Sequence, residues 1–197
     1  MSYSPKKIYI IVCEGPSEYA YLQELNRFLD ALDASFTFVS KSSGGGHFRQ
    51  VTQKFKDVKK DNKKASNINI WVDADTYKRN DEGDREKYSK KDNKYPDFLF
   101  NTFNFEDFLT MHLNEEKVLE WQNICERRNH FTNPMHSSTY EPLVKEHLFP
   151  DYEKGDMPFE ITKDNLERLF NNNNNPDIKF GSEFANFLER LLEETKQ

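Results

Sequence analysis

The chain has 197 residues, of which 36% are hydrophobic and 31% charged, and its formal charge is −6. This length suits one α/β domain with a buried core, and the acidic balance argues against a generally basic nucleic-acid binder. The two cysteines show no CxxC spacing, which argues against a zinc site or a disulfide scaffold. No apolar run is long enough for a membrane span or a signal peptide, so we expect a cytoplasmic protein without a membrane partner.

A strand followed by a turn and a helix is predicted near the N-terminus. The apolar residues 8–12 predict the strand, and Pro16 opens an amphipathic pattern for which Ser17 is the expected N-cap. Glu14 and Gly15 lie in the turn between them. A buried parallel strand meets solvent again at its carboxyl end, so we expect Glu14 at the mouth of a crevice. Glu14 is therefore the first candidate for a catalytic residue, and a solvated loop acid is the alternative.

A second strand is predicted over residues 36–39, and a glycine turn, Gly44 to Gly46, leads from it to a helical pattern over residues 48–58. This turn either holds a phosphate through its backbone N–H groups or is a plain flexible turn, because no Walker or dinucleotide-binding spacing occurs. Lysines dense enough to form a local positive surface end the helix: Lys54, Lys56, Lys59, Lys60, Lys63 and Lys64. A solvated helix end favours lysine as well.

A third strand is predicted over residues 68–72, and Asp73-Ala74-Asp75 follows it at once. Residues two apart in a strand project to the same side, so Asp73 and Asp75 can direct two carboxylates to one point. Two such anions repel each other unless a cation lies between them, and magnesium suits hard oxygen ligands. The sequence therefore predicts a divalent metal site at this pair.

Residues 76–95 are too charged for an element with a buried face, and we expect a mobile surface loop beside the acidic pair. Its basic residues could contact a phosphate backbone: Lys78, Arg79, Lys87, Lys90, Lys91 and Lys94. A short strand over residues 97–100 and a helix that begins near Glu106 are predicted next. Glu106 either complements the helix dipole or takes part in catalysis.

The remaining sequence is predicted to be helical and largely structural, with amphipathic helices over residues 164–170 and 182–192. The asparagine-rich residues 171–176 predict a flexible linker between them. We therefore expect an α/β, Rossmann-like fold with a mainly parallel sheet of about four strands flanked by helices. Residues 1–113 would form this core, and residues 114–197 would form a helical C-terminal extension packed on it.

Three motifs in this order resemble the Toprim domain, most closely that of the RloB-like family, which is related to the OLD-family nucleases. The motifs are Val12-Cys13-Glu14-Gly15, Trp71-Val72-Asp73-Ala74-Asp75 and Phe103-Asn104-Phe105-Glu106, the last followed by Met111-His112-Leu113. The resemblance spans residues 7–113. It implies that Asp73 and Asp75 ligate Mg²⁺ or Mn²⁺, that Glu14 is a ligand or a general acid/base, and that Glu106 is a further acid.

The resemblance also implies a metal-dependent nuclease that cleaves phosphodiesters of DNA or RNA, tRNA included, in bacterial anti-phage defence by abortive infection. Metal held by carboxylates can neutralise the developing charge and position a hydroxide, so the chemistry agrees. The implied partners are nucleic acid, an ATPase or another defence-system protein, and further copies of the chain. Some Toprim nucleases carry an attached ATPase domain that this chain lacks, which leaves open whether it acts alone.

Three alternatives stand beside the nuclease. The first, from a different class, is a non-catalytic Toprim-like binding or regulatory module of a larger defence complex. A haloacid-dehalogenase-type phosphatase would use Asp73-Ala74-Asp75-Thr76, although here the Thr comes one place early and the motif comes late in the chain. A nucleotide-sugar transferase with a DxD metal site would leave Glu14 and Gly15 unexplained.

Overall fold

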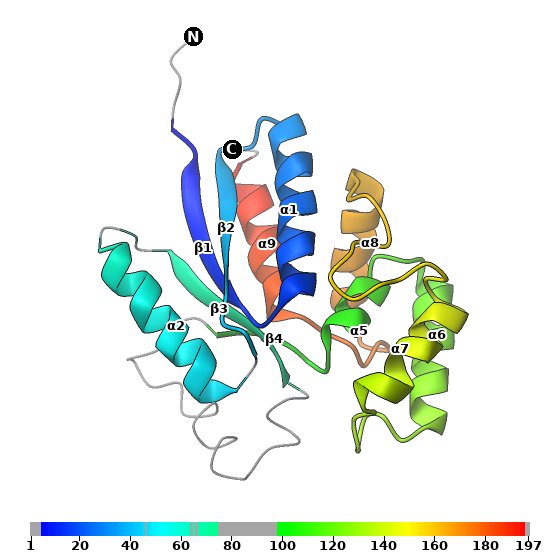
Figure 1. The fold of residues 1–197 in the computed structure, drawn as a ribbon. Coiled ribbons are helices and arrows are strands. Elements are labelled where there is room, and N and C mark those ends of the chain that lie inside the picture. The colour runs from blue at the N-terminus through cyan, green and yellow to red at the C-terminus, as the bar shows by residue number, and fades with distance from the viewer. Residues whose placement is uncertain (1–4, 46, 64, 66, 75–97, 196–197) are drawn as a thin grey trace.

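The computed structural model describes residues 5–45, 47–63, 65, 67–74 and 98–195. Within these residues one four-stranded sheet has the order β2-β1-β3-β4, and every neighbouring pair of strands is parallel (Figure 1). The strands are β1 (Lys7–Cys13), β2 (Phe36–Ser42), β3 (Ile68–Asp73) and β4 (Phe98–Asn101). The predicted α/β fold with a parallel sheet of about four strands is confirmed.

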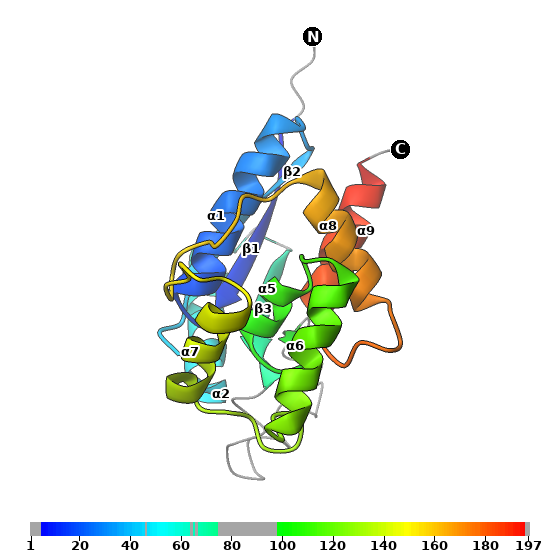
Figure 2. The same ribbon diagram turned by 90° about the vertical axis from the view of Figure 1, so that its right-hand side faces the viewer.

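Helices cover both faces of this sheet. Helices α1 and α9 lie on one face and α2 lies on the other, while α5 to α8 form a group beside α1 and α9 (Figures 1 and 2). The helices in the described part of the chain are α1 (Pro16–Ala31), α2 (Phe48–Asp61), α5 (Phe105–Thr110), α6 (Glu115–Arg127), α7 (Ser137–His147), α8 (Lys163–Asn173) and α9 (Glu183–Glu194). Among the described residues, no helix combines the length and apolar character that crossing a lipid bilayer requires.

Successive side chains along each strand point to opposite faces of the sheet, and they divide the core into two clusters. On the α1 and α9 face, the indole of Trp71 stacks on the ring of Phe184 with centroids 4.0 Å apart and planes 12° apart. On the opposite face, the apolar stripe of α2 (Val51, Phe55 and Val58) packs against the sheet. Both faces are therefore buried, and the ends of the strands are the parts of the sheet that remain open to a ligand.

Two local predictions are wrong. Helix α1 is capped by Gly15 rather than Ser17, because Pro16 occupies the first helical position, where its fixed φ fits the helix and its missing N–H is not needed. The asparagine run does not form a flexible linker throughout. Its first three residues belong to α8, and the buried Asn172 amide donates hydrogen bonds to the carbonyl oxygens of Met111 and Leu113 at 2.8 and 2.9 Å.

Candidate functional site

The centre of the sheet is a switch point in its topology. Strands β1 and β3 are hydrogen-bonded neighbours, but the chain continues from β1 to β2 at one edge and from β3 to β4 at the other. The connections therefore diverge at the carboxyl ends of β1 and β3, where parallel α/β sheets open a crevice. Glu14 directly follows β1, and Asp73 is the last residue of β3.

Three carboxylates come together in this crevice. Glu14 accepts a hydrogen bond through Oε1 from the backbone N–H of Asp73 at 2.8 Å, which ties the two strand ends together. One side-chain oxygen from each of Glu14, Glu18 and Asp73 lies within 4.8 Å of the others. The structure thus brings together two acids singled out from the sequence, and it adds Glu18, which sequence reasoning missed.

Glu18 lies in the first turn of α1, where it accepts a hydrogen bond from the backbone N–H of Gly15 at 3.2 Å. Its exposed fraction is only 4%, and burial raises its pKa to about 7. Glu18 precedes Leu22, Leu25 and Leu29 at helical spacing and so occupies a core position of α1. An acid at a core position is the sequence signal that could have revealed it.

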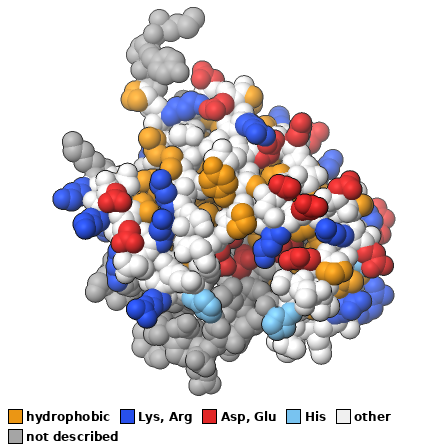
Figure 3. Space-filling view, viewed as in Figure 1, with side chains coloured by type: hydrophobic (Ala, Val, Ile, Leu, Met, Phe, Trp, Pro, Cys, Tyr) orange, Lys and Arg blue, Asp and Glu red, His pale blue; other side chains and the backbone are white. Residues whose placement is uncertain are grey.

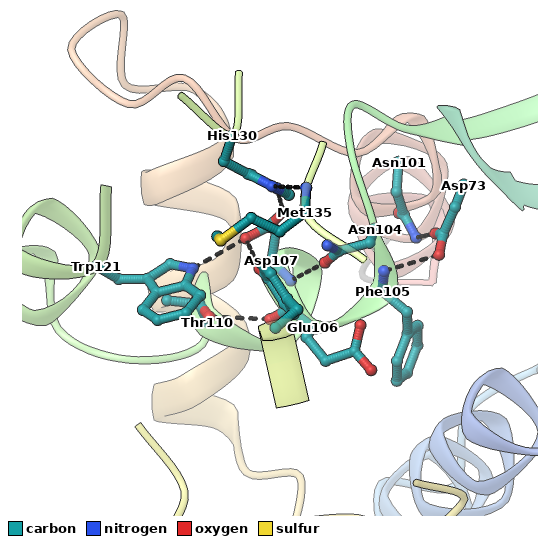
Figure 4. Close-up of polar contacts among 11 residues, drawn as sticks. Asp73, Asn101, Asn104, Phe105, Glu106, Asp107, Thr110, Trp121, His130 and Met135 are labelled. Atoms are coloured by element: carbon teal, nitrogen blue, oxygen red, sulfur yellow. Dashed lines mark hydrogen bonds and ion pairs between the residues drawn. The ribbon is translucent and has the colours of Figure 1, made fainter. Parts of the chain in front are cut away.

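Asp73 is held in a fixed orientation. Its Oδ1 accepts a hydrogen bond from the Asn101 amide at 2.8 Å, and its Oδ2 accepts one from the backbone N–H of Phe105 at 2.9 Å (Figure 4). The Oδ1 of Asn101 in turn accepts hydrogen bonds from Trp71 Nε1 at 3.0 Å and Ser182 Oγ at 2.8 Å. Such supporting contacts orient a carboxylate before any ion binds.

Glu106 lines the same cavity, which has a volume of about 350 Å³ and is also lined by Glu14, Glu18, Asp73 and Lys154. Burial raises the pKa of Glu106, while the charge of Lys154 acts in the opposite direction. The hydroxyl of Tyr152, from the segment after α7, donates a hydrogen bond to Glu106 Oε1 at 3.0 Å. Residues beyond position 113 therefore contribute directly to the site.

The neighbouring Asp107 points its carboxylate away from Glu106 and into a separate buried network (Figure 4). Its Oδ1 accepts hydrogen bonds from Trp121 Nε1 at 2.9 Å and from the hydroxyl of Tyr140, and its Oδ2 lies 3.3 Å from His130 Nε2. Asp107 is 2% exposed, so these contacts replace the water that its carboxylate loses on folding. They tie α5 to α6 and α7.

This network also offers three metal-ligating groups within 4.8 Å, on Asp107, Cys125 and His130. However, the backbone N–H of Met135 donates to His130 Nδ1 at 3.0 Å, so this nitrogen is an acceptor and the ring proton of the neutral imidazole is on Nε2. A protonated Nε2 donates to Asp107 and cannot ligate a metal. We therefore interpret this cluster as structural.

Several sequence predictions concern other positions. Gly44 and Gly45 of the glycine turn line the acidic cavity. Cys13 and His112 are buried, and burial raises the pKa of the Cys13 thiol and lowers the pKa of His112 to about 4. The predicted surface loop over residues 76–95 lies outside the described part of the chain, as do these predicted site residues: Asp75, Lys78, Arg79, Lys87, Lys90, Lys91 and Lys94.

No family model, curated protein or solved structure matches this chain. The geometry of the acidic cavity is therefore the main basis for a functional assignment.

Proposed function

We propose that the chain binds Mg²⁺ or Mn²⁺ at Glu14, Glu18 and Asp73 and hydrolyses nucleic-acid phosphodiesters, as a Toprim nuclease of bacterial anti-phage defence. The observation that carries the proposal is the approach of these three carboxylates to within 4.8 Å of one another. Anions this close, in a cavity that partly excludes water, repel one another strongly unless a cation neutralises them. All three groups offer hard oxygen atoms, which suit Mg²⁺ and Mn²⁺.

A metal bound there would polarise a phosphoryl oxygen and lower the pKa of a water molecule. Asp73 would keep its ligand oxygens in place through Asn101 and the Phe105 amide. Lys154 lines the same cavity and would place a positive charge beside the phosphate. Glu106 has a raised pKa and would hold a proton closer to neutral pH than an exposed glutamate does, so it could protonate the leaving oxygen.

Metal binding is tested by thermal unfolding with and without Mn²⁺. We expect Mn²⁺ to raise the unfolding temperature of the wild type but not that of Asp73→Asn or Glu14→Gln. Glu14→Gln is informative because the glutamine oxygen can still accept the hydrogen bond from Asp73 N–H, so a loss of the Mn²⁺ effect reports the lost charge. Equal stabilisation of all three proteins would contradict the proposed site.

Catalysis is tested separately on plasmid DNA and on tRNA. We expect wild-type cleavage to require Mg²⁺ or Mn²⁺, and we expect Lys154→Gln to keep the Mn²⁺ stabilisation while losing most of the cleavage. Stabilisation by metal without cleavage of DNA or RNA would instead identify a non-catalytic Toprim-like binding module. Toxicity of the wild type but not of Asp73→Asn, on expression in bacteria, would support the role in abortive infection.

A further inference from the structure

We propose that the outward face of α2 docks the phosphate backbone of a nucleic acid whose scissile phosphate lies in the acidic cavity. The identity of the polyanion rests on the proposed function, whereas the surface is defined by the residues of α2. We name this surface the α2 stripe and define it as Arg49, Lys56 and Lys60, all three exposed.

The three residues of the α2 stripe share one arc of the helix. At 100° per residue, Arg49, Lys56 and Lys60 fall within an arc of about 40°, and the helical residue Lys59 lies farther round on one side. The acids of this helix, Asp57 and Asp61, lie roughly 100° away from the centre of the stripe by the same geometry. The stripe therefore presents one sign of charge, unlike a solvated helix face on which the two signs alternate.

The orientation of α2 is fixed by its other face. Val51, Phe55 and Val58 are buried against the sheet, so α2 cannot rotate without exposing apolar surface. Figure 3 shows Lys and Arg side chains over α2 at the left of the view, with acidic side chains between some of them. Because the whole chain carries a formal charge of −6, a basic surface on this helix is a local feature rather than a result of composition.

The stripe begins in the first turn of α2, and the segment that leads into this helix lines the acidic cavity. Ser42, Gly44 and Gly45 line the cavity, and the chain enters α2 only three residues after Gly45. From Arg49 to Lys60 the helix rises about 16 Å, which matches roughly five base-pair steps of 3.4 Å. A nucleic acid with one phosphate in the cavity can thus extend its neighbouring phosphates along the stripe.

The chemistry of α2 favours nucleic acid over a lipid surface. Helices that bind membranes in the interfacial plane bury an apolar face among the lipids. The large apolar side chains described on α2, namely Val51, Phe55 and Val58, are buried in the protein core. Contacts from Arg and Lys to phosphates carry no sequence information, so we infer docking that is independent of base sequence.

The test compares two triple variants that remove the same charge from exposed helical positions. The stripe variant is Arg49→Gln/Lys56→Gln/Lys60→Gln. The matched control is Lys117→Gln/Lys145→Gln/Lys163→Gln, with one change each on α6, α7 and α8. Binding of a fluorescein-labelled DNA duplex of about 20 base pairs, longer than the stripe, is measured by anisotropy at several salt concentrations, with Ca²⁺ replacing Mg²⁺ to slow cleavage.

Each lost phosphate contact lowers the slope of log affinity against log salt concentration by about 0.9, so the stripe variant should lose about 2 to 3. The control should lose less than about 1 on the same scale. Equal slopes for the two variants would overturn the inference. So would equally tight binding of the wild type to phosphatidylserine vesicles, if the stripe variant lost both interactions.

The two proposals fail in distinguishable ways. If Mn²⁺ stabilises the wild type but no duplex binds at low salt, the inference about α2 is overturned and the metal site stands. If duplex binding depends on the stripe but no metal effect appears, the docking surface is supported and the nuclease proposal is overturned. The stripe variant should retain the full Mn²⁺ stabilisation, because its changes lie outside the acidic cavity.

Discussion

Replacing Glu18 by glutamine should stabilise the metal-free protein and should reduce the further stabilisation that metal provides. The side chain is buried, and burial raises its pKa to about 7 from an ordinary value of 4.5. A difference of one pKa unit corresponds to about 1.4 kcal/mol, so ionised Glu18 lowers the free energy of unfolding by about 3 kcal/mol at pH 8. With a chelator present, Glu18→Gln should therefore be more stable than the wild type by up to about 3 kcal/mol.

The gain should follow the ionisation of Glu18. Because its pKa is raised in the folded state, the wild type loses stability as the pH rises from about 4.5 to about 7, so the advantage of Glu18→Gln should vanish at low pH. With Mn²⁺ at about 100 times its dissociation constant, the wild type should gain about 2.7 kcal/mol. Loss of one ligand should reduce that gain by about 1.4 kcal/mol or more, which corresponds to a tenfold weaker affinity.

Urea unfolding at pH 5 and pH 8, with chelator or Mn²⁺, measures all of these quantities. The glutamine oxygen can still accept the hydrogen bond from Gly15 N–H, so the start of α1 is preserved. Glu160→Gln, at an exposed position, is the matched control and should change neither the free energy of unfolding at pH 8 nor the stabilisation by Mn²⁺. An unchanged Mn²⁺ gain in Glu18→Gln would refute its assignment as a ligand, and unchanged stability at pH 8 would refute the argument from burial.

Three further substitutions test the surrounding framework. Asn172→Ala should lower the free energy of unfolding by about 2 kcal/mol because two buried carbonyl groups lose their donor, and Asn171→Ala on the exposed side of α8 should change it by less than about 0.5 kcal/mol. Asp107→Asn should lower the free energy of unfolding by about 3 kcal/mol or more, since the buried donors around Asp107 lose a charged acceptor. A smaller loss than that of Asn172→Ala in the same urea titration would contradict this expectation. His112→Gln should remove one contribution to the pH dependence of stability. Burial lowers the pKa of His112 to about 4 from 6.5, so the free energy of unfolding of the wild type falls as the pH drops from 6.5 to 4. The difference in this free energy between the wild type and His112→Gln should therefore shrink over the same pH range.

The sequence predicts the strands, and the acids that follow them, because apolar runs and turn residues are local signals. Glu14 and Asp73 each follow a predicted strand, and parallel strands present their carboxyl ends at one edge of a sheet. Their proximity therefore follows from the fold class. The hydrogen bond between Glu14 and the Asp73 N–H depends on β1 and β3 being neighbours, which periodicity does not reveal.

The features missed are those set by tertiary contacts. Glu18 looks like an ordinary acid in the first turn of a helix, and its place on the apolar stripe of α1 is the one sequence signal of its burial. Tyr152 and Lys154 belong to a segment without a motif, and they reach the cavity because the chain after α7 passes beside α1 and α5. Asn172 was misjudged because composition describes the unfolded tendency of an asparagine run, whereas specific carbonyl partners decide its structure.

The contacts of Asn101 have a consequence for protein synthesis. Its side chain links Asp73 to the hydroxyl of Ser182, the residue that caps α9, and Phe184 of that helix stacks on Trp71. A nascent chain on the ribosome lacks both supports until residues 182–184 have emerged, long after Glu14, Glu18 and Asp73 have been made. The hydrogen-bonded support behind Asp73 is thus completed only late in translation, although the direct partners of Asp73, Asn101 and Phe105, are made much earlier.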